Sequence, residues 1–211
     1  MKGIFKRILR AAILWSGLGL AWVVLDRGNE KGVLEERLEW RDFFQDYIRP
    51  SLPLAEQFDF PLRPPDGEDS YLQVGYQEKE SLGEWWALGK KGAVSEEPVY
   101  SIGDGWVTVA EDFQASWKQV VIVAHRLSSG YPDTAEVLYA NLQSMSVKAG
   151  DFVKRGQKIG TIESSDDADA SRLYLEVREE VGLGLGPGES SDVVGWTQPS
   201  RFIRERRNSL R

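Results

Sequence analysis

The sequence predicts an all-β domain over residues 58–205, built as a small β-sandwich. Two observations indicate this class. Short apolar runs separated by glycine-containing turns follow one another through the segment, and no long helical pattern interrupts them. Within residues 137–163, apolar residues recur around Gly150 and Gly156, and each glycine can adopt the positive φ that a tight turn needs. This rhythm is typical of a strand that doubles back twice within about 20 residues.

The other elements of the domain follow in order along the chain. Residues 58–75 are rich in proline, aspartate and glycine, which predicts an extended lead-in with a turn at residues 65–67. The expected strands are residues 98–102, 106–110, 119–125 and 172–178, and the last alternates so cleanly that one face should turn inward. Loops are expected at residues 126–135 and 181–195. A short helix should begin at Pro199, before a basic tail at residues 206–211.

A basic and then apolar stretch opens the chain. Four cations precede the apolar run at residues 11–25, namely Lys2, Lys6, Arg7 and Arg10. The run is short for a membrane span of about 20 residues, but Ile8 and Leu9 extend it because Arg10 can snorkel. No good cleavage site follows, so we expect an uncleaved signal anchor over residues 1–28, with its positive end in the cytoplasm. A single-pass anchor of the inner membrane would leave the β domain in the periplasm or outside the cell.

Residues 29–57 are expected to hold an amphipathic helix and a linker. Large apolar side chains recur every three or four residues between Glu30 and Ile48. Pro50 and Pro53 should end the helix. We expect it to pack on the domain or to space the domain from the membrane, and a partner-binding helix is the alternative.

Composition argues against several kinds of site. The 211 residues include no cysteine, which excludes disulfides and thiolate metal ligands. The one histidine, His125, is too few for a hydrolytic zinc site, and we expect a surface or packing role for it at the end of a strand. The net charge is −7 and becomes more negative without the basic N-terminus. Nucleic acid and anionic membrane surfaces are therefore not expected partners.

At this point four stretches carry a resemblance: PVYSIGDGWVTVAED, QVVIVAHRLSSG, VLYANLQSMSVKAGDFVKRGQKIGTIESS and RLYLEVREE. They resemble the LytM/lysostaphin-type zinc endopeptidases, the family with a duplicated hybrid motif that cuts peptidoglycan cross-bridges. The likeness covers roughly residues 58–203. It implies an antiparallel β fold of the barrel-sandwich hybrid type with a central groove.

The resemblance also marks the five positions where this family holds its zinc ligands and catalytic histidines. Its His-x-x-x-Asp motif matches the stretch from Ser81 to Trp85, which puts these two residues at ligand positions. Its Tyr-Ala-His-Leu motif places Asn141 where a catalytic histidine is expected. Its His-Leu-His motif places Arg172 at the second catalytic histidine and Tyr174 at the third ligand. All five positions are therefore replaced.

The replacements do not suit zinc chemistry. Catalytic zinc needs three nitrogen or oxygen ligands in a tetrahedral array with an open position for water. Serine and tryptophan offer almost nothing to Zn²⁺, Tyr174 would bind only as a phenolate, and the permanent charge of Arg172 would repel the ion. Asn141 cannot transfer a proton at neutral pH. We therefore expect no catalytic residue, no metal ligand and no zinc at these positions.

The same groove has gained aromatic and polar side chains. Six candidates for a groove or partner-binding surface are Trp85, Trp86, Asn141, Arg172, Tyr174 and Glu176. Aromatic rings beside an arginine are typical of surfaces that recognise glycans or peptides. The alternative is that the tryptophans fill the emptied metal pocket. We expect core filling for one of them and recognition for the other.

These expectations favour a catalytically inactive, membrane-anchored domain at the cell envelope. It would act as a binding, regulatory or scaffold module in peptidoglycan metabolism, with a cell-wall hydrolase, an envelope protein or peptidoglycan as its partner. The enzyme alternative is a zinc metalloendopeptidase with relocated ligands. A third hypothesis is a barrel-sandwich adaptor of an export complex.

Overall fold

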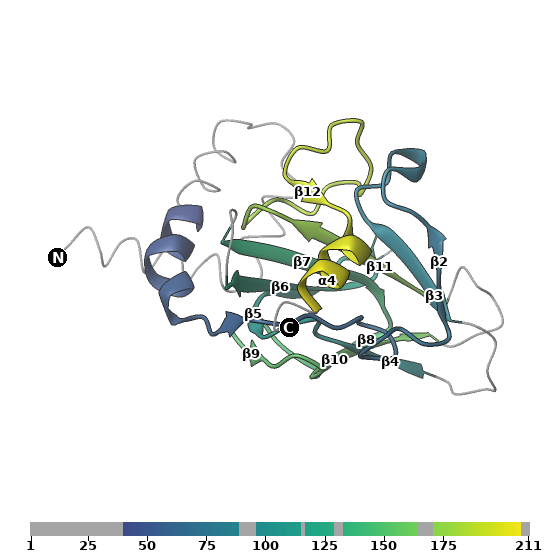
Figure 1. Cartoon of the computed structure of the whole chain (residues 1–211), viewed down its shortest axis with the longest axis horizontal. Coiled ribbons are helices and arrows are strands. Elements are labelled where there is room, and N and C mark those ends of the chain that lie inside the picture. The colour runs from purple at the N-terminus through teal and green to yellow at the C-terminus, as the bar shows by residue number, and fades with distance from the viewer. Residues whose placement is uncertain (1–39, 89–95, 115–116, 129–132, 164–170, 208–211) are drawn as a thin grey trace. The chain divides into compact units, whose positions relative to one another are not determined.

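A computed structural model describes residues 40–88, 96–114, 117–128, 133–163 and 171–207 (Figure 1). The expected signal anchor at residues 1–28 lies outside these ranges. In the described part of the chain, no helix is long and apolar enough to cross a membrane. The described residues divide between two compact units: residues 40–51 and 181–187 belong to one, and the described residues from 52 to 180 and from 188 to 207 belong to the other. The predicted domain limits at residues 28, 57 and 205 stay predictions.

The first unit contains the end of the predicted amphipathic helix. Residues 40–43 are α-helical, and two further helical turns follow, η1 (Phe44–Ile48) and η2 (Arg49–Ser51). The spacing of three and four residues stacks the rings of Phe43 and Tyr47, with centroids 5.3 Å apart. The helical turns end at Ser51, between the two prolines that were expected to end them. Residues 40–51 are therefore helical as predicted, but Phe44–Ile48 form a π-helix and Arg49–Ser51 a 3-10 helix rather than the expected α-helix. The part before residue 40 lies outside the described residues.

In its described residues, the second unit contains two β-sheets, one α-helix and one short 3-10 helix. Its elements are β1 (Leu54–Ala55), β2 (Ser70–Val74), η3 (Glu78–Glu80), β3 (Glu84–Leu88), β4 (Glu96–Tyr100), β5 (Gly105–Asp112), β6 (Gln119–Leu127), β7 (Thr134–Leu142), β8 (Ser144–Met145), β9 (Phe152–Val153), β10 (Lys158–Glu163), β11 (Arg172–Arg178), β12 (Trp196–Thr197) and α4 (Pro199–Arg207). The larger sheet follows the order β2-β3-β11-β7-β6-β5-β9, with β1 beside β6 and β12 beside β11. The smaller sheet has the order β4-β10-β8. This confirms a mostly β architecture.

The pairing is antiparallel with one exception. β1 runs parallel to β6, with Leu54 opposite Arg126 and Ala55 opposite Leu127. This corrects the purely antiparallel prediction. The polar loop predicted at residues 126–135 is also shorter than expected, because β6 continues to Leu127 and β7 begins at Thr134. β2 was not predicted at all, since the sequence suggested only an extended lead-in there.

The turns that indicated the fold are present. Gly150 and Gly156 adopt φ values of 94° and 73°. The Gly150 N–H donates to the Val107 carbonyl, and the Gly156 N–H donates to the Ser101 carbonyl, each at 2.9 Å. These bonds attach the stretch of residues 137–163 to the strands on either side of the β4–β5 turn. The glycine positions therefore predicted the chain reversals correctly.

The hydrophobic core lies on one face of the central strands of the larger sheet. Leu173, Leu175 and Val177 of β11 belong to it, as do Val137 and Tyr139 of β7. Phe202 and Ile203 of α4 complete it. The alternation of β11 predicts one inward face, but both faces are buried, since every residue from Leu173 to Arg178 is buried. The polar residues of that second face are buried because they hydrogen-bond to one another, as described next.

Candidate functional site

The predicted site residues are brought together by the pairing of β3 with β11. In this antiparallel pair Tyr174 lies directly opposite Trp85, and Leu173 lies opposite Trp86. Side chains alternate between the two faces of a strand. Trp85 and Tyr174 therefore share one face with Arg172, whereas Trp86 belongs to the core face. The two adjacent tryptophans have different surroundings for this reason.

An aromatic cluster occupies the shared face. Its members are Trp85, Trp117 and Tyr174, and each indole ring lies 5.0 Å from the phenol ring, centroid to centroid. The Arg172 guanidinium covers the Trp85 ring, with its Cζ 4.1 Å from the ring centroid. At this distance a cation and an indole attract each other. Trp117 was not among the predicted site residues, because it comes from the turn before β6 and its sequence neighbours are polar.

Two glycines allow the cluster to be this tight. A Cβ on Gly83 would lie 2.7 Å from Tyr174 Cζ and 2.5 Å from the Leu175 carbonyl oxygen. A Cβ on Gly188 would lie 2.4 Å from Trp117 Cη2 and 3.2 Å from the Tyr174 hydroxyl. Protein atoms therefore fill the space around the phenol, and the backbone approaches the rings as closely as only glycine permits.

A buried hydrogen-bond network holds the end of the phenol. The Tyr174 hydroxyl lies 2.8 Å from Glu176 Oε2, to which it donates, and 3.1 Å from the Gly188 carbonyl. Glu176 Oε1 accepts from Trp196 Nε1 at 2.7 Å and from Arg178 Nε at 2.5 Å. Both members of the Glu176–Arg178 ion pair are 1% exposed. Buried charges are tolerated when they are paired and hydrogen-bonded in this way.

Burial and the neighbouring Glu176 carboxylate raise the pKa of Tyr174 far above its ordinary value of 10.0. Burial contributes most, because it disfavours the charged phenolate. The carboxylate adds to this shift, since it would repel a phenolate and it accepts a hydrogen bond from the neutral hydroxyl. Tyr174 is therefore a neutral donor at any physiological pH.

Asn141 and Ser81 have structural partners. Asn141 adopts a left-handed φ of 64°, which asparagine tolerates better than most residues. Its Nδ2 donates to the Arg172 carbonyl at 2.6 Å, and its backbone N–H donates to the Trp117 carbonyl at 2.9 Å. Ser81 is buried, and its hydroxyl donates to the Gly83 carbonyl at 3.1 Å. Both residues fix the backbone around the cluster.

Trp86 lies in the core, which corrects its place among the groove candidates and agrees with the expectation that one of the two tryptophans fills the core. Its ring packs edge-on against Phe60 in the core, and its Nε1 donates to Glu84 Oε2 at 3.1 Å. Glu84 also accepts from the Ser200 backbone N–H at 2.9 Å and from the Ser200 hydroxyl at 2.8 Å. This carboxylate therefore satisfies the first turn of α4, where negative charge is favourable. Glu176 is likewise buried rather than exposed to a groove.

His125 has a packing role, which is one of the two roles expected for it, and it does not lie at the surface. It is fully buried, its Nδ1 donates to the Asp104 carbonyl at 2.8 Å, and its ring meets Phe58 edge-on. Among the described residues, none hydrogen-bonds to its Nε2. Burial lowers the pKa of His125 from 6.5 to about 4, although its hydrogen bond to Asp104 acts in the opposite direction. The imidazole is neutral at physiological pH.

The residues at the expected metal positions do not fit a zinc ion. Three ligands would have to converge on an open position, but the rings of Trp85, Trp117 and Tyr174 pack against one another there. The one phenol that could ligate stays protonated. Among the residues that the structure describes, no three of histidine, cysteine, aspartate or glutamate lie close enough together to hold a metal ion.

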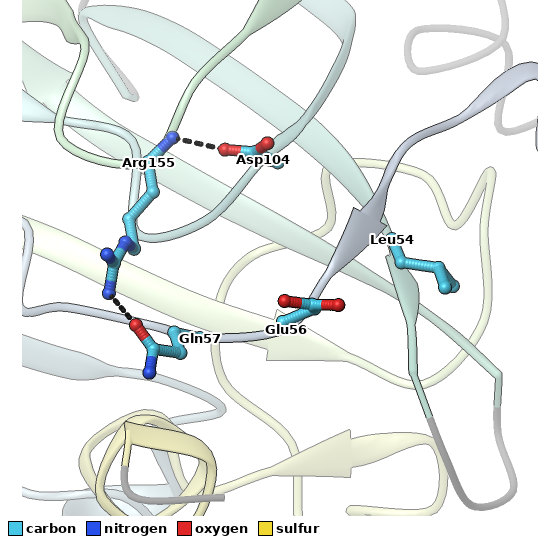
Figure 2. A pocket seen from close by; sticks show the side chains of 5 residues that line it. All are labelled: Leu54, Glu56, Gln57, Asp104 and Arg155. Carbon is cyan, nitrogen blue, oxygen red and sulfur yellow. Dashed lines mark hydrogen bonds between the residues drawn. The ribbon is translucent and has the colours of Figure 1, made fainter. Parts of the chain in front are cut away.

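A separate polar pocket of about 190 Å³ lies away from the aromatic cluster, and Figure 2 shows the five side chains that line it. They are Leu54, Glu56, Gln57, Asp104 and Arg155. The Arg155 backbone N–H donates to Asp104 Oδ1 at 2.8 Å, and its Nη1 donates to Gln57 Oε1 at 2.7 Å (Figure 2). None of the predicted site residues lines this pocket. Its polar atoms largely satisfy one another, so it offers no clear ligand chemistry.

Comparisons with known proteins place this geometry in context. A sequence model described as peptidase family M23 matches residues 90–186, a range that includes Asn141, Arg172 and Tyr174 but neither Ser81 nor Trp85. No curated protein matches the chain. Three solved structures are similar to the chain. A zinc containing peptidase from Vibrio cholerae is 24% identical, with 58% of this chain and 37% of that chain covered and a TM-score of 0.44, and a chain of the SpoIIIAH–SpoIIQ complex is 23% identical, with 62% of this chain and 97% of that chain covered and a TM-score of 0.46. Lysostaphin from Staphylococcus simulans is 18% identical, with 68% of this chain and 52% of that chain covered and a TM-score of 0.45. The chain thus spans 37% of the Vibrio cholerae peptidase and 52% of lysostaphin.

Proposed function

We propose that residues 90–186, which match the model of peptidase family M23, belong to a domain that is catalytically inactive and works as a binding, regulatory or scaffold module in peptidoglycan metabolism. One observation supports the loss of catalysis above all others. Where the resemblance expects zinc ligands, the Tyr174 phenol is packed between Trp85 and Trp117 and donates to a buried carboxylate. A metal, its water and a substrate carbonyl would all need the volume that these rings fill.

The two other positions support the same proposal. Catalysis of peptide hydrolysis in such a site calls for a group that accepts and returns a proton near neutral pH. Asn141 has no titratable group, and its amide is already bonded to the Arg172 carbonyl. The Arg172 guanidinium stays cationic and lies over the Trp85 ring. The side chains that replaced the chemistry thus hold the strands and the neighbouring loop together.

The cluster supports binding because part of it reaches the surface. Trp85 and Arg172 are both partly exposed, whereas the Tyr174 beneath them is buried. An arginine stacked on an indole presents a flat, amphipathic surface of the kind enriched in the centres of protein interfaces. We propose a cell-wall hydrolase, another envelope protein or peptidoglycan as the partner, and no nucleic acid. The inner membrane would hold the protein through residues 1–28, with the β domain in the periplasm or outside the cell.

Zinc content and activity test the loss of catalysis. The full-length protein, purified from membranes in detergent, should contain far less than one zinc per chain by elemental mass spectrometry. It should also fail to release peptides from purified peptidoglycan, with or without added zinc. Stoichiometric zinc together with chelator-sensitive cleavage would overturn the proposal and support a metalloendopeptidase with relocated ligands.

Matched variants test the binding role. Trp85→Ala combined with Arg172→Ala should reduce recovery of envelope partners in a pull-down from envelope extract. Phe152→Ala is the control, because Phe152 is an exposed aromatic residue on β9, at the opposite end of the larger sheet from β2 and β3. Equal recovery with both variants would exclude the cluster as the binding surface. Recovery of an inner-membrane transporter alone would instead support the export-adaptor hypothesis.

A further inference from the structure

One edge of the larger sheet has no neighbouring strand among the described residues. In the described part of the chain, β3 is the only strand that pairs with β2, which stands at the end of the strand order (Figure 1). The β2 sequence, SYLQV, contains neither a charge nor a proline. Tyr71 and Leu72 are 44% and 42% exposed. Natural proteins usually protect such an edge with charges, prolines or very short strands, because it can accept another strand.

The other sheet ends carry these protections. At the opposite end of the larger sheet, β9 is only two residues long. In the smaller sheet, the end strand β4 carries Glu96, Glu97 and Pro98, and the other end strand, β8, has two residues. β2 is therefore the one end strand of the described sheets that is both five residues long and free of these devices. The contrast indicates that this edge is kept open for a partner.

The negative charge on both sides of β2 favours a partner segment with positive charge. Glu68 and Asp69 precede the strand, and Glu78 and Glu80 follow it, with Lys79 as the single cation between them. A second copy of the chain would place one of these acidic flanks beside another, whether the two β2 strands ran parallel or antiparallel. Like charges brought together across a sheet are unfavourable. The complement is a segment with an uncharged, β-forming middle and lysine or arginine at both ends.

We propose that β2 binds an extended, basic-flanked segment of a partner protein by strand addition to the sheet edge. The bound segment would continue the larger sheet next to the aromatic cluster. Val74 lies opposite Trp85 of the cluster in the β2–β3 pair, and Arg172 Nη1 reaches Gln73 Oε1 at 3.5 Å. This proposal rests on the proposed function, because it specifies the chemistry of the partner that the binding module would recognise.

Defined peptides test the proposal on the full-length protein. The probe is a fluorescein-labelled peptide with five alternating valine and threonine residues, as many as β2 has, between two lysines at each end. The first control peptide carries glutamates in place of the lysines, and the second has proline at its centre. We expect fluorescence anisotropy to show saturable binding of the lysine peptide only. Either no binding of the lysine peptide or equal binding of all three peptides would overturn the proposal.

Variants of the protein locate the binding. Leu72→Lys and Tyr71→Lys each place a cation on the open edge and should weaken binding about 10-fold or more, which corresponds to about 1.4 kcal/mol. Phe152→Lys is the control at the opposite end of the sheet and should bind like the wild type. Circular dichroism checks that each variant is folded. Equal losses in the edge and control variants would exclude β2 as the site.

Analytical sedimentation of the wild type tests whether a second copy of the chain binds at β2 instead of a partner protein. Self-association that Leu72→Lys abolishes would show that a second copy occupies β2, against the proposal. The outcome for zinc is independent of all these measurements. A protein that holds zinc and cleaves peptidoglycan would overturn the proposed function, and the peptide measurements would still decide whether β2 binds a strand. A protein without zinc or activity that also fails to bind the lysine peptide would overturn the strand-addition proposal alone.

Discussion

The Tyr174 hydroxyl lies 2.8 Å from the carboxylate of Glu176, two residues further along β11 on the same face of the strand. This contact joins the aromatic cluster to the Glu176–Arg178 ion pair and to Trp196 of β12. The phenol must remain neutral to donate this hydrogen bond. The face of the sheet where the resemblance expects a hydrolytic site is therefore a packed and hydrogen-bonded layer that stabilises the domain.

The ion pair at the centre of this layer should be essential for stability. Glu176→Gln removes the carboxylate from beside a buried guanidinium, so we expect the free energy of unfolding to fall by about 3 kcal/mol. Urea denaturation of the full-length protein measures the change. The matched control is Glu205→Gln on α4, which removes an exposed ion pair with Arg201 and should leave the free energy of unfolding nearly unchanged. Equal losses in the two variants would contradict the buried network.

The close approach of Gly83 to the phenol gives a second prediction. Gly83→Ala would place a methyl group 2.7 Å from Tyr174 Cζ and 2.5 Å from a backbone oxygen that cannot easily move. We expect a loss of about 1–3 kcal/mol in stability, together with a change in near-ultraviolet circular dichroism from the displaced rings. Gly75→Ala is the control, because a Cβ there meets only ordinary contacts at 3.6 and 3.7 Å. An unchanged Gly83→Ala protein would show that the cluster is looser than described.

The parts of the fold that follow from local pattern were predictable from the sequence. β11 follows from strict alternation, and the reversals at Gly150 and Gly156 follow from glycines placed between apolar runs. The predictions failed where pairing between distant segments decides the outcome. β1 has only two residues, and its parallel pairing with β6 leaves no local signal. β2 lies in an acidic, glycine-containing stretch that gives no β signal of its own.

The site residues likewise divide into those that could be predicted from the sequence and those whose position depends on tertiary structure. Trp85, Asn141, Arg172 and Tyr174 lie close together because β3 and β7 both pair with β11. Trp86 was misplaced because residues 84–88 had not been recognised as a strand, whose alternation alone separates two adjacent tryptophans. Trp117 was missed because its loop reaches the cluster only through tertiary structure. Its one sequence signal is an aromatic residue in an otherwise polar turn.

The buried imidazole predicts how stability depends on pH. The unfolded chain binds a proton at His125 below pH 6.5, whereas the folded chain does so only below about pH 4, because burial lowers the pKa. Between these values the unfolded state holds more protons, so stability falls as the pH falls, by about 3 kcal/mol for this one residue. Below about pH 4 this contribution levels off.

Urea denaturation at pH 7, 5 and 4 measures this dependence. In His125→Gln, which keeps a side-chain donor near the Asp104 carbonyl, the histidine part of the slope should disappear. The difference between wild type and variant isolates His125 from the carboxylates, which titrate in both proteins. Parallel curves for the two proteins between pH 7 and 4 would show that the imidazole is not buried as a neutral group.

Restoring the expected ligands should restore a metal site. The fivefold variant combines Ser81→His, Trp85→Asp, Asn141→His, Arg172→His and Tyr174→His. It removes two of the three packed rings and the cation, and it places nitrogen and oxygen donors on strands that already lie side by side. We expect about one zinc per chain by elemental analysis and a melting temperature that rises when zinc is added, since an ion that binds only the folded state stabilises it.

The single variants Tyr174→His and Trp85→Asp are the controls for this restoration, and neither should bind zinc, because ligands act as a set. Circular dichroism without metal shows whether the fivefold variant folds before zinc is added. If folding is lost, the fourfold variant that keeps Asn141 should still bind zinc, since Asn141 stands at a catalytic position rather than a ligand position in the resemblance. A folded variant with all three ligands restored that binds no zinc would mean that Ser81, Trp85 and Tyr174 do not converge as metal ligands must.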